Sequence, residues 1–219
     1  MLSKTPVDAH DALQRLREGN ERFVGNVCSR DVSASASRRE EHIEGQRPFA
    51  IVLSCSDSRV PSELVFDCGL GQLFVVRVAG NVVAPSLVGS VEFAAVKFDT
   101  RLVVVMGHSG CGAVTATIDE LQHKQSAPSD NILDIVERIA PSIAELVDCN
   151  LPPAELMRAA VRANVRASAS HLRHSSRLLE QRIAAGKLLV VGAEYSLETG
   201  CVDFFDGVEA RRAAVGAAH

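Results

Sequence analysis

Short runs of apolar residues recur along the chain and predict the strands of one sheet. Four continuous runs cover residues 49–54, 73–76, 102–106 and 188–191. Strands that are buried on both faces have this pattern, and parallel sheets bury both faces. After a turn at residues 198–200, we expect a last edge strand over residues 201–205.

The segments between these runs have apolar residues at helical spacing. They predict helices over residues 86–97, 112–121 and 132–147, and a long helix or a pair of helices after Pro153 and before Gly186. We also expect a short helix over residues 40–44, and an N-terminal helix with Thr5 as its N-cap and Pro6 as its first residue.

Strands that alternate with helices are typical of α/β proteins. The expected fold is a central, mostly parallel β-sheet flanked by helices, with an N-terminal helical arm and a C-terminal edge strand. No internal repeat, linker or change in composition divides the 219 residues. A single domain over residues 1–219 is therefore expected.

Composition and charge narrow the classes of partner. Apolar residues make up 47% of the chain, as in packed globular proteins, and the net charge of −4 provides no basic surface for nucleic acid. No apolar stretch approaches the roughly 20 residues of a membrane span. The first residues lack the apolar region of a signal peptide, so we expect a cytoplasmic protein. A periplasmic mature form, with its leader removed, is the alternative.

Two cysteines and a histidine lie at the ends of predicted strands. Cys55 ends the first apolar run, and His108 and Cys111 follow the third. The carboxyl ends of parallel strands meet at one edge of a sheet, so these side chains are expected to converge. Two thiolates and one imidazole suit Zn²⁺, and three protein ligands leave the fourth position free for chemistry. We expect one zinc ion per chain.

The other four cysteines show no comparable pattern. Six cysteines in a chain of this length do not indicate a disulfide scaffold. We interpret the remaining ones as small buried or unreactive thiols; they are Cys28, Cys68, Cys149 and Cys201.

Asp57 and Arg59 follow Cys55 directly and have two possible arrangements. An arginine can hold a carboxylate through two parallel hydrogen bonds. Held in this way, Asp57 can accept a hydrogen bond from metal-bound water or hydroxide. Released from Arg59, it becomes the fourth metal ligand and closes the site.

Zinc lowers the pKa of a coordinated water and so generates hydroxide near neutral pH. Two anionic sulfurs donate more charge than imidazoles do, which makes the zinc a weaker Lewis acid. We therefore expect activity to rise through mildly alkaline pH.

Three motifs resemble those of the β-class carbonic anhydrases. They are Cys-Ser-Asp-Ser-Arg at 55–59, Arg-Val-Ala-Gly-Asn at 77–81 and His-Ser-Gly-Cys-Gly at 108–112. Their order and spacing agree with that family from about residue 46 to residue 114. The resemblance implies zinc-dependent, reversible hydration of carbon dioxide to bicarbonate and a proton by metal-bound hydroxide.

The same resemblance implies roles for individual residues. Cys55, His108 and Cys111 match the zinc ligands, and Asp57 and Arg59 match the catalytic pair of the family. The implied substrate pocket includes Gln46, which bonds a substrate oxygen, Phe74, which lines its apolar wall, and the backbone amide of Gly112. Because carbon dioxide is small and apolar, we expect Ala79 to hold it together with Phe74. In the family the glutamine and the aromatic wall come from the partner chain, which implies a homodimer or a dimer of dimers.

The chain departs from one variant of the family pattern. Some members bind bicarbonate at an inhibitory site built on a tryptophan shortly before the first cysteine. This chain has no tryptophan, and Val52 stands at that position, although Arg77 matches the arginine of that site. We therefore expect an open site, in which Asp57 is not a zinc ligand.

Three other functions can be weighed against this one. The same scaffold could hydrolyse carbonyl sulfide or carbon disulfide, which the sequence does not separate from carbon dioxide hydration. A zinc-binding interaction protein without catalysis would be expected if Asp57 or Arg59 were replaced, and both are present. Zinc-dependent dehydrogenation would need a dinucleotide-binding Gly-x-Gly-x-x-Gly motif, which the chain lacks.

Overall fold

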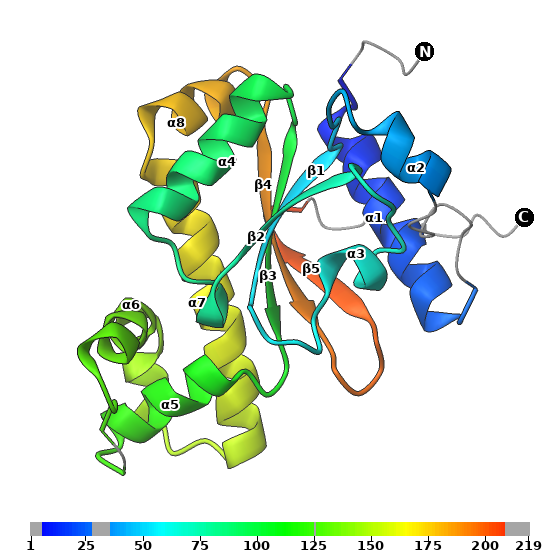
Figure 1. The fold of residues 1–219 in the computed structure, drawn as a ribbon. Helices are drawn as coiled ribbons and strands as arrows, with labels where there is room; N and C mark the ends of the chain where they lie inside the picture. The colour runs from blue at the N-terminus through cyan, green and yellow to red at the C-terminus, as the bar shows by residue number, and fades with distance from the viewer. Residues whose placement is uncertain (1–5, 28–35, 125, 209–219) are drawn as a thin grey trace, which may run out of the picture.

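The computed structural model describes residues 6–27, 36–124 and 126–208, and its centre is a five-stranded sheet (Figure 1). The strand order is β2-β1-β3-β4-β5. The strands are β1 Ala50–Ser54, β2 Leu73–Arg77, β3 Leu102–His108, β4 Leu189–Tyr195 and β5 Val202–Asp206. The first four are parallel, and β5 pairs antiparallel with β4 at the edge. This arrangement confirms the α/β fold expected from the sequence.

Helices cover both faces of the sheet (Figure 1). One face packs against α4 Pro85–Lys97, α7 Pro153–His174 and α8 Arg177–Ala184. The other packs against α1 Ala9–Val24 and α3 Ser62–Val65. Because side chains of a strand alternate between the faces, Ile51 and Leu53 face the first group of helices, and Val52 faces the second.

A third apolar cluster lies beyond the carboxyl ends of the parallel strands. It is formed by α5 Gly112–Leu121, α6 Asp130–Val147 and the first part of α7, and it includes Cys55 and Cys111. The short turn η2 Ala79–Asn81 packs against α5 and α6 in the same region. The carboxyl ends of the strands are thus enclosed by helices on one side.

The strand β3 is longer than its apolar run predicted. It continues through Gly107 to His108 and is buried over its whole length. Glycine is required at 107 because a Cβ there would lie 2.6 Å from Cγ2 of Val165 on α7. His108 is therefore the last residue of the strand, not a residue that follows it.

The structure also corrects several helix boundaries. The N-terminal helix begins at Ala9, with Asp8 as the N-cap that accepts from His10 N–H at 2.9 Å; the expected N-cap, Thr5, lies outside the described residues. The helix α2 spans Ala36–Glu41 instead of residues 40–44. The expected segment after Pro153 is a pair of helices. None of the helices in the described ranges is long and apolar enough to cross a membrane.

Candidate metal centre

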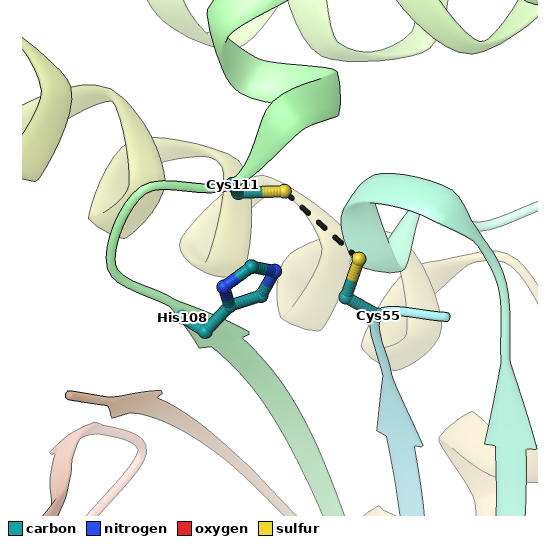
Figure 2. A group of neighbouring side chains, drawn as sticks. All are labelled: Cys55, His108 and Cys111. Atoms are coloured by element: carbon teal, nitrogen blue, oxygen red, sulfur yellow. Dashed lines mark hydrogen bonds between the residues drawn. The ribbon is translucent and has the colours of Figure 1, made fainter. Parts of the chain in front are cut away.

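Three side chains from separate parts of the chain meet at the carboxyl edge of the sheet (Figure 2). Cys55 directly follows β1, His108 ends β3, and Cys111 is the N-cap of α5. Their ligand atoms all lie within 4.8 Å of one another, and the two sulfurs are 4.0 Å apart. All three residues are buried. They converge because β1 and β3 are parallel neighbours, as the sequence predicted.

A tight turn brings Cys111 back towards His108. Gly110 has a φ of 62°, a left-handed conformation that favours glycine, and the chain then enters α5. Cys111 has an extended conformation and accepts from Thr115 N–H through its carbonyl. It therefore caps α5, where the partial positive charge of the helix N-terminus favours a thiolate.

The donor set fits a zinc ion. A tetrahedral centre with Zn–S bonds of ordinary length places two sulfurs about 3.8 Å apart, close to the observed separation. His108 Nδ1 lies 3.0 Å from the Ser109 carbonyl, which accepts its proton and leaves the lone pair on Nε2. That Nε2 is buried and has no hydrogen-bond partner in the described part of the chain. A buried nitrogen in this state is suited to bind a metal.

The two thiols lie within hydrogen-bonding distance of each other, with their sulfurs 4.0 Å apart. A hydrogen bond from the Cys111 thiol lowers the pKa of Cys55, although burial acts in the opposite direction. The same bond, together with burial, raises the pKa of Cys111. Gly80 N–H lies 3.4 Å from Cys55 Sγ and also favours the thiolate there. A dication can replace the thiol protons and stabilise both thiolates.

Asp57 is held beside this cluster by Arg59. One carboxylate oxygen accepts from Arg59 N–H at 2.9 Å and from Nε at 3.0 Å, and the other accepts from Nη2 at 2.7 Å. Arg59 therefore keeps the pKa of Asp57 well below its usual value, which favours the carboxylate. Asp57 Oδ2 lies 3.9 Å from His108 Nε2. The carboxylate is thus near the metal ligands while bound to its arginine.

Arg77 fixes the loop that carries Cys55 and Asp57. Its Nε donates to the Cys55 carbonyl at 3.0 Å, and its Nη2 donates to the Asp57 carbonyl at 2.6 Å. Arg77 is the last residue of β2 and pairs with Ser54 at the end of β1. The edge strand therefore holds the loop in place through one side chain.

Comparison with known proteins identifies the family. The family model described as carbonic anhydrase matches residues 50–202. The chain is 38% identical to a carbonic anhydrase of Mycolicibacterium smegmatis, with 93% of this chain and 95% of the relative covered. It is 37% identical to carbonic anhydrase 2 of Mycobacterium tuberculosis, over 91% and 93% of the two chains. The chain belongs to the β-class carbonic anhydrase family.

Solved β-carbonic anhydrases share the fold. The structure of CcaA superposes with a TM-score of 0.72 at 27% identity and covers 92% of this chain and 94% of its own. The Coccomyxa enzyme, solved with acetazolamide, superposes with a TM-score of 0.66 at 22% identity and covers 91% and 86%. Each likeness covers more than nine tenths of this chain.

The four expected substrate-pocket residues of this β-carbonic anhydrase fall into two groups. Ala79 begins the η2 turn beside Cys55, and Gly112 directly follows Cys111, so both lie at the metal ligands. Gln46 and Phe74 lie at the amino ends of β1 and β2, at the opposite end of the sheet. A single chain therefore does not bring these two residues to its own metal ligands.

The surroundings of Gln46 and Phe74 differ from each other. Gln46 is exposed and lines a cavity of about 1230 Å³. Phe74 packs in an aromatic cluster on α4, with ring centroids 6.3 Å from Phe93 and 6.1 Å from Phe98. The ring is part of a local apolar core and only half-buried in the single chain.

The remaining cysteines of the described ranges are not part of this cluster. Burial raises the pKa of Cys68 to about 12, which makes it unreactive. Cys149 and Cys201 are exposed, and Cys28 lies outside the described residues.

Proposed function

We propose that this chain is a zinc enzyme that catalyses the reversible hydration of carbon dioxide to bicarbonate and a proton. The observation that carries the proposal is the buried cluster of Cys55, His108 and Cys111, in which His108 Nε2 has no hydrogen-bond partner among the described residues. Family membership makes carbon dioxide the expected substrate.

The residues around the cluster support this chemistry. Zn²⁺ bound to the three ligands supplies a Lewis acid that activates water. Asp57 is ionised and held by Arg59. Its Oδ2 lies 3.9 Å from His108 Nε2, so this oxygen can accept a hydrogen bond beside the cluster. Gly112 is the first residue of α5, where a backbone N–H that is free of helical bonding can orient a substrate oxygen.

The proposal includes an open site. The pair of Asp57 and Arg59 supports it, because both carboxylate oxygens accept hydrogen bonds from Arg59, the arrangement expected for the open form. The side chain of Arg77 also supports it. Arg77 donates hydrogen bonds to two backbone carbonyls of the Cys55–Asp57 loop. Its guanidinium is therefore paired with the protein backbone and not with an inhibitory bicarbonate ion.

We also propose that the site is completed in a homodimer. Gln46 and Phe74 are too far along the sheet to serve their own metal ligands, so a second copy must supply them if they have the implied roles. The β2 strand is at the edge of the sheet, and large apolar side chains beside it are exposed in the single chain. Phe93 and Val96 of α4 are 53% and 56% exposed, and Leu70, just before β2, is 41% exposed.

Zinc analysis and a carbon dioxide hydration assay test the proposed function. Cys111→Ala should lose zinc and activity together, because two ligands hold the ion less tightly than three. Asp57→Ala should keep zinc but lose most of the rate. Cys149→Ala, at an exposed cysteine, is the matched control and should resemble the wild type. A zinc-free Cys111→Ala variant with full activity would contradict the proposal. Parallel assays with carbonyl sulfide and carbon disulfide would show which substrate is preferred.

Mixing two inactive variants tests the shared site. Gln46→Ala and Asp57→Ala each remove one component, and a mixed dimer contains one intact site if Gln46 acts across the interface. Random exchange of subunits should then restore about one quarter of the wild-type activity. No recovery after demonstrated subunit exchange would show that Gln46 does not serve the partner's site.

A further inference from the structure

We propose that Asn164, a buried residue of α7, is a positioning residue of the metal centre that acts through Gly80 on the sulfur of Cys55. The inference rests on the proposed zinc function. None of the motifs in the sequence includes Asn164, which lies 84 positions after Gly80.

Two hydrogen bonds in series connect Asn164 to the ligand. Asn164 Nδ2 donates to the Gly80 carbonyl at 2.8 Å, and Gly80 N–H donates to Cys55 Sγ at 3.4 Å. Asn164 is 2% exposed, and Gly80 and Cys55 are also buried. Bulk water therefore cannot replace the amide, and the Gly80 carbonyl would be unpaired without it.

Gly80 needs this support because its backbone has an unusual conformation. Its φ of 65° and ψ of 18° lie in the left-handed region, within the η2 turn. A Cβ at this position would lie 2.8 Å from Ile139 Cδ1 and 3.0 Å from Ala113 Cβ, so the residue fits closely between α5 and α6. The hydrogen bond from Asn164 on α7 restrains the Gly80 carbonyl and so helps to keep Gly80 N–H directed at the sulfur.

The direction of that N–H matters for the charge on the sulfur. A hydrogen bond to a thiolate draws electron density away from it, so the sulfur donates less charge to the metal. A centre with two thiolates is a weak Lewis acid, and this bond offsets part of that weakness. Loss of Asn164 should therefore change the electronic state of the centre as well as its stability.

Cobalt substitution provides a direct readout. Asn164→Leu keeps the number and branching of the side-chain heavy atoms and removes the donor, and Asn164→Ser is too short to reach the Gly80 carbonyl. In Co²⁺-loaded protein, both should shift the sulfur-to-cobalt charge-transfer band to longer wavelength, because the Cys55 sulfur becomes a stronger donor. Zinc affinity, measured by competition with a chelator, should fall by about 10- to 100-fold. Ser168→Ala, one turn further along α7 and also buried, is the control and should match the wild type.

A second measurement remains decisive if the leucine variant does not fold. In protein loaded with ¹¹³Cd, the Gly80 amide proton should show scalar coupling to the metal through the Cys55 sulfur, and Asn164→Ser should weaken or abolish that coupling. An unshifted cobalt band, unchanged zinc affinity or unchanged coupling in folded Asn164 variants would overturn the inference. Absence of any sulfur-to-cobalt band in the wild type would instead contradict the proposed function itself.

Discussion

The turn at Gly80 allows a prediction whose size can be worked out from the structure. Gly80→Ala places a Cβ 2.8 Å from Ile139 Cδ1 and 3.0 Å from Ala113 Cβ. The left-handed conformation costs a residue with a Cβ about 1–2 kcal/mol. Overpacking of a buried site adds about 1–3 kcal/mol, of which rotation of the flexible Ile139 side chain can relieve a part. We expect the free energy of unfolding to fall by about 2–4 kcal/mol in total.

Two other glycines separate these contributions. Gly110 has a φ of 62°, but no heavy atom lies within 4 Å of a Cβ placed there, so Gly110→Ala should show the backbone contribution alone. Gly89 lies in α4 with ordinary helical geometry and open space, so Gly89→Ala should increase stability by about 0.5–1 kcal/mol. Urea unfolding of the zinc-loaded proteins at one protein concentration measures all three.

The result that refutes the reasoning is specific. If Gly80→Ala loses no more stability than Gly110→Ala, the contacts with Ile139 and Ala113 have no energetic weight. The close fit of the η2 turn between α5 and α6 would then not explain why glycine occupies this position.

Three further predictions concern the metal ligands and the Asp57–Arg59 pair. Arg59→Gln should raise the pKa of Asp57 towards its ordinary value, as followed by NMR titration of the carboxyl carbon, and an unchanged pKa would exclude Arg59 as the cause of the shift. Because the pKa of Asp57 is lowered in the folded state, the carboxylate contributes stability above about pH 4 and loses it as the pH falls through the folded-state pKa. Wild type and Asp57→Asn should therefore differ most in urea unfolding above about pH 5 and converge in acid. Removal of zinc by a chelator should lower the melting temperature of the wild type, and Cys111→Ala should show little further change; an equal drop in both would place the ion elsewhere.

The sequence predicted the sheet and the convergence of Cys55, His108 and Cys111 because both depend on local patterns. Continuous apolar runs mark strands that are buried on both faces, and β1 and β3 are such strands. The carboxyl ends of parallel strands lie at one edge of the sheet, so a residue at such an end can be placed without knowledge of its side-chain contacts. Cys55 and His108 therefore could be placed together from the chain order alone.

Other features depend on contacts that no local pattern records. Asn164 resembles any other polar residue of a helix in the sequence, and only the packing of α7 against the η2 turn shows its partner. The start of the first helix was misplaced because Thr5-Pro6 and Asp8 are both good capping sequences. The positions of Gln46 and Phe74 follow from strand direction, but their relation to a metal ion involves a second chain.

In the proposed zinc enzyme, the separation of the ligands along the chain sets an order for metal loading. Cys55 and Cys111 are 56 positions apart and meet only when β1 pairs with β3. An unfolded or partly synthesised chain offers His108 and Cys111 as a weak two-donor hold on an ion, and tight capture must wait for the sheet. Retention of zinc against a chelator therefore reports that β1 and β3 have paired. Release of zinc would be an early sign that these strands have separated.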